Sequence, residues 1–130
     1  MKTYDPRESP DPGDWLRRDE TARIELVESY HRRRRVRMPN VRLHATIHVI
    51  VENQLALGGP VVVETLARLR GEGLTRHDAI HAIGSVLAER IYDLLKHGPP
   101  AEPIDPNVVY LDGLRKLTAA DWRKSALPRE

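Results

Sequence analysis

The sequence predicts an all-α protein: a compact helical bundle of about four main helices, with short C-terminal helices and proline-rich tails. Along residues 14–98, apolar side chains recur at the three- and four-residue spacing of a helix face. Glycine and proline stand at the ends of these stretches, where helices end and begin. A length of 130 residues with 40% hydrophobic residues suits a single globular domain.

The chain opens with a segment that favours turns over helix. Residues 1–13 contain three prolines and a glycine, and they are predicted to form a tail that is flexible or draped over the body. Asp14 is the predicted N-cap of a helix that runs, in one or two pieces, to about Arg34. Acidic residues lead this helix and arginines close it, which is the order that the helix dipole favours.

Three further helices are predicted, and each has a start signal and a stop signal. They are 41–57, between Asn40 and Gly58-Gly59; 60–71, from Pro60 to Gly71; and 75–97, between Thr75 and Gly98. The predicted organisation is therefore a tail over residues 1–13, a helical bundle over 14–98 and an extension over 99–130.

The C-terminal extension begins with a linker from Gly98 to Pro103. Asp105-Pro106 starts a short helix, and Thr118 caps another that carries Trp122. These helices are predicted to pack a small apolar face on the body or on a second subunit.

Composition narrows the class of protein. Cysteine is absent, which excludes disulfides, thiolate metal sites and cysteine nucleophiles. The net charge of +2 is too small to imply nucleic acid by itself. No apolar run approaches the length of a membrane span and no signal-peptide pattern opens the chain, so a cytoplasmic protein without membrane contact is expected.

The central feature is a pair of histidines on each of two predicted helices. His44 and His48 are four residues apart on the first helix, as are His77 and His81 on the second. Residues at this spacing lie one above the other, with Cβ atoms about 5–6 Å apart. Two imidazoles so placed can hold one metal ion from a single helix.

Helical phase predicts that both pairs face inward. On the first helix, His44 and His48 share an arc with Val51 and Leu55. On the second, Gly84 shares the arc with the histidine pair. The two pairs are therefore predicted to be buried against each other, with the helices antiparallel or steeply crossed, and Gly84 is predicted to mark a close approach.

The leading interpretation is a metal-binding protein with a four-histidine site built from two facing helices. A transition metal is the expected cofactor, and zinc and iron lead because imidazole suits them. If all four histidines bind one ion, the site would be structural or, with a redox metal, an electron-transfer site. If water occupies one position, Glu52 would be a candidate general base. The sequence defines no reaction. The predicted ligands are His44, His48, His77 and His81, with Glu52, Gln54 and Glu89 as additional ligands or as partners of the ligands.

The alternative is a non-enzymatic interaction protein, or a small subunit of a larger assembly, whose histidines form a hydrogen-bonded core. A second copy of the chain or another protein would then contact the tails, Trp122 and the arginines. Arg32–Arg37 is predicted to be a solvated helix end, with a nucleic-acid contact as the weaker alternative. His31 and His97, each in a last helical turn, are predicted to be structural.

The middle of the chain resembles a family of small bacterial helical proteins of unknown function. The matching residues are Asn40, Leu43, His44, His48 and Gln54, then His77, Ala79, His81 and Glu89. The resemblance covers about residues 40–95 and implies an all-helical fold without a defined activity. Ferritin-like di-metal bundles also project ligands inward, but neither paired-histidine helix carries their Glu-x-x-His signature, which disfavours a carboxylate-bridged di-iron site.

Overall fold

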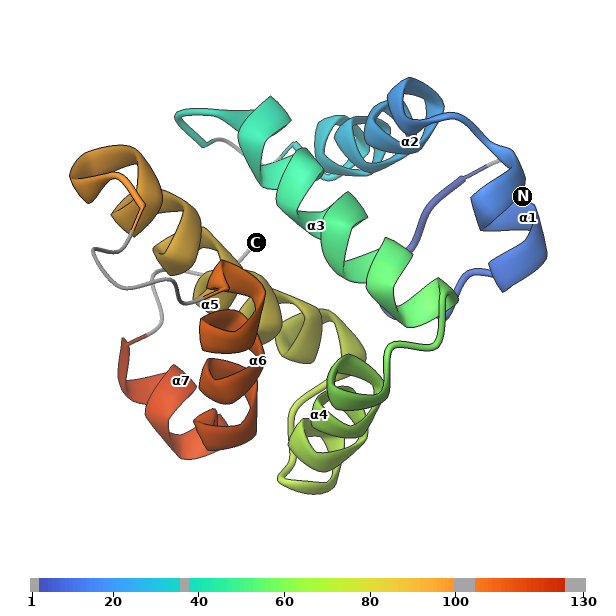
Figure 1. Ribbon diagram of the computed structural model, residues 1–130. Helices are drawn as coiled ribbons and strands as arrows, with labels where there is room; N and C mark the ends of the chain where they lie inside the picture. The colour runs from blue at the N-terminus through green and yellow to red at the C-terminus, as the bar shows by residue number, and fades with distance from the viewer. Residues whose placement is uncertain (1–2, 36–37, 100–104, 126–130) are drawn as a thin grey trace.

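The computed structural model describes residues 3–35, 38–99 and 105–125, and this part of the chain forms seven helices and no strand (Figure 1). The all-α prediction is confirmed. The helices are α1 (Pro12–Arg17), α2 (Glu20–Arg33), α3 (Val41–Ala56), α4 (Pro60–Gly71), α5 (Arg76–His97), α6 (Pro106–Lys116) and α7 (Ala119–Ser125).

The two paired-histidine helices begin where their capping residues predict. The Asn40 side chain accepts a hydrogen bond from the Leu43 backbone N–H at 3.0 Å. The Thr75 hydroxyl accepts one from the Asp78 N–H at 3.1 Å. Each bond satisfies a backbone donor that the first helical turn leaves without an intrahelical partner.

The first predicted helix is two helices, and its start differs from the prediction. Asp11, not Asp14, caps α1, because Pro12 occupies the first helical position that suits its fixed φ. Arg18 is extended, with ψ at 147°, and Asp19 then caps α2 by accepting from the Ala22 N–H at 2.7 Å.

Helix α3 lies at the centre and contacts α1, α2, α4 and α5 (Figure 1). It contributes to two apolar cores. The N-terminal core comprises Tyr4, Trp15, Ile24, Val27, Tyr30, Ala45 and Val49. The C-terminal core comprises Val51, Val62, Leu69, Leu74, Ala79, Ile80, Ala82, Ile83, Tyr110, Leu114, Ala119 and Trp122.

The C-terminal helices are part of the main body. Tyr110 and Leu114 of α6 and Trp122 of α7 are buried in the C-terminal core beside residues of α4 and α5. Trp122 is only 6% exposed. The alternative interpretation, an interaction protein, assigned Trp122 to the contact with a partner, and the burial of this side chain corrects that assignment. An indole of this size stabilises the fold by leaving water, and the chain itself supplies the covering surface.

The segment that precedes α1 enters the interior. The sequence predicts a tail over residues 1–13, but the structure buries Tyr4 completely and Pro6 largely. The Tyr4 ring packs against the rings of Trp15 and Tyr30, with centroids 5.7 and 6.2 Å away. A buried tyrosine requires a hydrogen-bond partner for its hydroxyl. For Tyr4 this partner is Glu52 of α3.

No single helix in the described residues is long and apolar enough to cross a membrane. Helices α3 and α4 satisfy the length and composition test only together, as a pair bent by 105°.

Gly84 lies at a close approach of α5 to α3, which confirms the prediction for this residue. A Cβ atom at Gly84 would lie 3.0 Å from the Cγ2 atom of Ile47. A side chain at this position would press on Ile47, so the close approach of the two helices favours glycine.

We predict that Gly84→Leu lowers the free energy of unfolding by about 1–3 kcal/mol, because the added side chain overpacks the α3–α5 contact. Gly71→Leu is the matched control, since a Cβ at Gly71 meets nothing within 4 Å. Thermal unfolding followed by circular dichroism should show a lower midpoint for the first variant only. Equal midpoints for the two variants would contradict the close approach.

Candidate metal centre

Five histidines from three helices meet beside Tyr4 and Tyr30 of the N-terminal core. We call them the histidine cluster: His31 of α2, His44 and His48 of α3, and His77 and His81 of α5. The two predicted pairs therefore face each other, and a fifth imidazole joins them. Ring centroids lie 4.7 Å apart for His44–His48, 4.4 Å for His77–His81, 4.9 Å for His48–His81 and 4.8 Å for His31–His44.

The pairing between α3 and α5 is antiparallel. The first histidine of α3, His44, lies beside the second of α5, His81, with ring centroids 5.1 Å apart. Helices that run in opposite directions bring such positions together, and Figure 1 shows α3 and α5 running in this way.

Ring nitrogens converge on His48. Its Nε2 atom lies 3.1 Å from Nε2 of His44 and 2.9 Å from Nε2 of His81. Zinc–nitrogen bonds of about 2.0–2.1 Å place two ligands of a tetrahedral ion about 3.3 Å apart. The spacing in the cluster is close to that of imidazoles sharing one ion, and it is also within hydrogen-bond distance.

Two sets of three histidines bring one ring nitrogen each to within 4.8 Å of the others. The sets are His31, His44 and His48, and His48, His77 and His81. His48 belongs to both. The cluster is thus able to hold a metal ion, with His48 at its centre.

Tyr4 determines which nitrogen of His48 carries the proton. The Tyr4 hydroxyl donates its only hydrogen to Oε2 of Glu52 at 2.6 Å. The Tyr4 hydroxyl oxygen lies 3.3 Å from Nδ1 of His48. With its only hydrogen donated to Glu52, this oxygen accepts a hydrogen bond from His48, so the proton is on Nδ1. The lone pair of neutral His48 is then on Nε2, which faces the other histidines.

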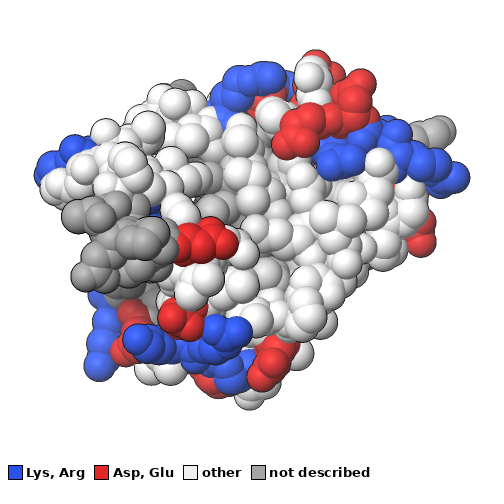
Figure 2. Space-filling view, in the orientation of Figure 1, with Lys and Arg blue, Asp and Glu red and all other residues white. Residues whose placement is uncertain are grey.

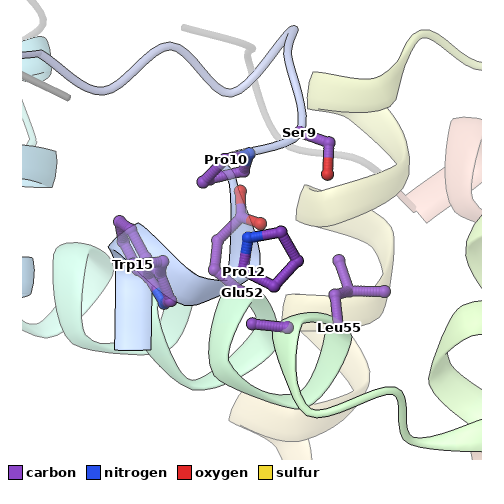
Figure 3. Close-up of a pocket in the computed structure, with 7 residues that line it drawn as sticks. Ser9, Pro10, Pro12, Trp15, Glu52 and Leu55 are labelled. Carbon is purple, nitrogen blue, oxygen red and sulfur yellow. The ribbon is translucent and has the colours of Figure 1, made fainter. Parts of the chain in front are cut away.

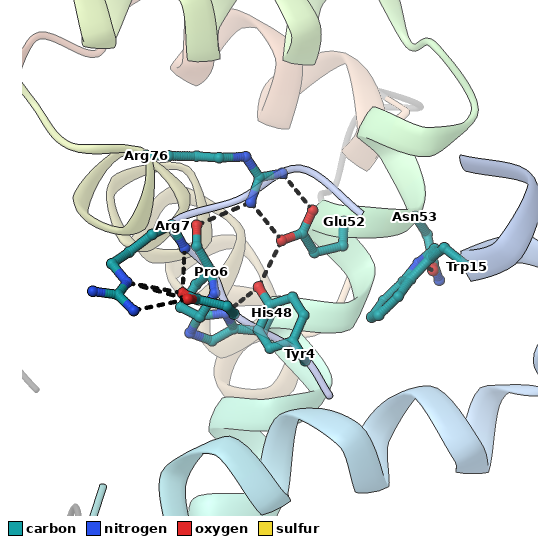
Figure 4. Close-up of polar contacts among 9 residues, drawn as sticks. Tyr4, Pro6, Arg7, Trp15, His48, Glu52, Asn53 and Arg76 are labelled. Carbon is teal, nitrogen blue, oxygen red and sulfur yellow. Dashed lines mark hydrogen bonds and ion pairs between the residues drawn. The ribbon is translucent and has the colours of Figure 1, made fainter. Parts of the chain in front are cut away.

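The buried ion pair of Glu52 and Arg76 holds the Tyr4 hydroxyl in the position from which it accepts from His48 (Figure 4). Arg76 donates to both carboxylate oxygens of Glu52, at 2.7 and 2.9 Å, and also to the backbone carbonyl of Pro6 at 3.0 Å. The Glu52 and Arg76 side chains are 1% and 3% exposed. Two parallel bonds between a guanidinium and a carboxylate have a defined geometry, so this pair positions the carboxylate that receives the Tyr4 hydrogen.

Burial and charge keep Tyr4 protonated and Arg76 charged. Burial, followed by the negative charge of Glu52, raises the pKa of Tyr4 well above its ordinary value, so its hydroxyl stays a donor. Burial by itself would lower the pKa of Arg76, but its hydrogen bonds to Glu52 and the charge of Glu52 raise it overall.

His31 is the cluster member that the sequence did not assign to the site. It is fully buried, and its Nδ1 lies 2.8 Å from the Val27 carbonyl oxygen. A carbonyl only accepts, so Nδ1 carries the hydrogen and Nε2 carries the lone pair. The bond to Val27 fits the predicted structural role, and the structure adds that His31 lies within the histidine cluster. Two signals could have found it: its position seven residues after Ile24 on the buried face, and the Glu28-x-x-His31 spacing on α2.

The cluster is open to solvent on one side. His31 and His48 are fully buried, whereas His44, His77 and His81 are half-buried. The prediction that both pairs are buried is thus correct for His48 and wrong for the other three, whose rings stay partly exposed. These three half-buried rings are the solvent-exposed part of the cluster.

The remaining predicted ligands lie outside the cluster. Glu89 is 68% exposed at its side chain and pairs with Arg90, which corrects its assignment. It follows His81 by eight residues, about 80° around the helix and 12 Å along it. Gln54 accepts a hydrogen bond from the hydroxyl of Tyr110 at 2.7 Å, and burial raises the pKa of Tyr110 to about 12.

The arginine run is partly held by the chain itself. Arg33 donates to the Tyr4 carbonyl at 3.3 Å, and the guanidinium of Arg34 lies over the Tyr30 ring, 5.3 Å from its centroid. Arg37, also in the predicted run, lies outside the described residues. On the face in Figure 2, Lys and Arg side chains lie beside Asp and Glu side chains around the edge, and uncharged residues fill the middle. A broad basic surface for nucleic acid is not visible on this face.

Glu52 also borders a small pocket of about 30 Å³ (Figure 3). That volume is enough for about one or two water molecules. The pocket is therefore too small for an organic substrate. Its lining includes Ser9, Pro10, Pro12, Trp15, Glu52 and Leu55.

Comparison with protein-family models, characterised proteins and solved structures gives no match to this chain. The resemblance to a small bacterial helical family stays a prediction. The function of the cluster is accordingly argued from its own geometry.

We predict that Glu52→Gln lowers the free energy of unfolding by about 3 kcal/mol, because it leaves the buried Arg76 cation without an ionic partner. Glu64→Gln, on the exposed face of α4, is the control and should change it by less than about 0.5 kcal/mol. Urea denaturation measures both. A Glu52 variant as stable as the control would show that the ion pair does not support the site.

Proposed function

We propose that this protein binds a transition metal ion, zinc or ferrous iron, at the histidine cluster. His48 is the central ligand, and His77 and His81 of α5 complete a three-histidine set with it. The observation that carries this proposal is the Nε2 atom of His48, which is directed at other imidazole nitrogens while Tyr4 holds the proton on Nδ1. Ligating histidines ordinarily have their second nitrogen held in this way.

A hydrogen-bonded core explains the same contacts less completely. In the tautomer that Tyr4 imposes, His48 Nε2 offers one lone pair to two neighbouring ring nitrogens. A hydrogen bond uses that lone pair for one neighbour at a time. A metal ion accepts lone pairs from several imidazoles together, so one ion can be shared by the three histidines of a set.

The donor set and its surroundings suit a metal of this class. Neutral imidazoles favour zinc, iron, nickel and copper over magnesium and calcium, and the chain has no cysteine to offer thiolate. Three histidines leave a coordination position for water, which such an ion makes more acidic. Glu52 does not serve as a general base in this proposal, because both of its carboxylate oxygens are engaged by Arg76 and one also by Tyr4. Its role is to position His48 through Tyr4.

We predict that the purified protein contains zinc or iron at a metal-to-protein ratio near one and that His48→Ala removes it. His97→Ala is the matched control, because His97 is an exposed histidine in the last turn of α5. Elemental analysis after mild dialysis gives the ratio for each protein. Folded wild-type protein that stays metal-free after incubation with Zn²⁺ or Fe²⁺ would support the hydrogen-bonded core instead.

We predict that Tyr4→Phe weakens Zn²⁺ binding by about 10–100-fold without abolishing it, the effect of losing a residue that orients a ligand. The variant keeps the ring but loses the oxygen that accepts from His48 Nδ1. Tyr92→Phe is the control, since Tyr92 is 58% exposed on α5. Competition with a chromophoric chelator gives both dissociation constants. Equal constants for the two variants would show that Tyr4 plays no part in the metal site.

A further inference from the structure

We propose that the cluster holds two alternative metal sites that share His48 and are occupied one at a time. The inner site is His31, His44 and His48; the outer site is His48, His77 and His81. This inference rests on the proposed metal binding and specifies which of the five histidines belong to each site.

The inner site is built from α2 and α3 and lies deeper in the molecule. Its ring centroids are 4.8 Å apart for His31–His44, 4.7 Å for His44–His48 and 5.5 Å for His31–His48. His31 and His48 are fully buried. The Val27 carbonyl holds the proton of His31 on Nδ1, just as Tyr4 does for His48, so both rings offer Nε2 as the ligand atom.

The outer site joins α3 to α5 and is nearer to solvent. Its ring centroids are 4.9 Å apart for His48–His81, 4.4 Å for His77–His81 and 5.9 Å for His48–His77. Only His48 of this set is fully buried. The outer site thus has two half-buried rings, whereas the inner site has one, His44.

His48 limits the cluster to one fully coordinated ion. An imidazole bridges two metals only when both of its nitrogens are deprotonated, and Nδ1 of His48 carries a hydrogen that is held by Tyr4. With His48 committed to one site, the other keeps only two imidazoles. An ion that moves between the sites keeps His48 and exchanges the other two ligands, and the proximity of the His44 and His81 rings, 5.1 Å apart, brings the incoming ligands near the outgoing ones.

Paired variants test this division in the full chain. His31→Ala/His44→Ala retains the outer site, and His77→Ala/His81→Ala retains the inner site. Each folded protein is titrated with Zn²⁺ against a chromophoric chelator, with circular dichroism as the check on folding. We expect a ratio near one for the wild type and for each double variant. Adding His48→Ala to either variant should weaken Zn²⁺ binding by more than about 100-fold. This exceeds the effect of removing a residue that only orients a ligand.

The outcomes separate this inference from the proposed function. A wild-type ratio near two overturns occupancy of one site at a time. Binding by only one double variant, or by neither while the wild type binds, overturns the existence of two alternative sites and leaves metal binding intact. Absence of binding by the folded wild type overturns metal binding itself.

A measurement on the wild type covers the case in which a double variant does not fold. The protein is labelled with ¹⁵N at histidine, and its side-chain spectra are recorded with one equivalent of Zn²⁺. We expect the His48 Nε2 signal to report full coordination, and the signals of both other pairs to report partial coordination. Full coordination of His77 and His81 with no change at His31 and His44, or the reverse, would overturn the inference.

Discussion

The buried ion pair of Glu52 and Arg76 is the contact on which the rest of the site depends. It connects the C-terminal part of α3 to the first turn of α5, and through the Pro6 carbonyl it also binds the N-terminal segment. Moving two charges out of water is costly, and their attraction compensates only when their geometry and remaining hydrogen bonds are good. Here Tyr4 and Pro6 supply those additional bonds. A pair of this kind contributes more to the definition of one arrangement than to net stability.

The ion pair acts on the histidines through a chain of hydrogen bonds. Glu52 fixes the direction of the Tyr4 hydroxyl, and Tyr4 fixes the tautomer of His48. Without Tyr4, either nitrogen of His48 can carry the proton, and the lone pair is no longer directed at the cluster. Glu52 and Tyr4 thus decide whether the imidazoles of the cluster can act together as metal ligands, although Tyr4 contacts only His48 among them and Glu52 acts through Tyr4.

The cluster borders the N-terminal core. His48 lies between Ala45 and Val49 of that core in the sequence, and the rings of His48 and His77 lie 6.1 Å from Tyr4 and 5.8 Å from Tyr30. Four imidazoles beside His48 in a domain of this size replace apolar surface that would otherwise stabilise the fold. The proposed metal ion would offset this, because an ion bound only by the folded state stabilises that state. Such an ion would link α3 to α2 or α5.

The sequence by itself determined the helices and the pairs of histidines. The caps Asn40 and Thr75, the glycine at position 84 and the four-residue histidine spacing are local signals, and the structure bears each of them out. Only the tertiary structure brought in Tyr4, His31 and Arg76, and only it placed Glu89 on the surface. Tyr4 and His48 are 44 positions apart, and Arg76 and Pro6 are 70 apart. Helical periodicity shows which face of a helix is apolar, but the partner of a buried polar group depends on how distant segments pack, and no local pattern encodes that.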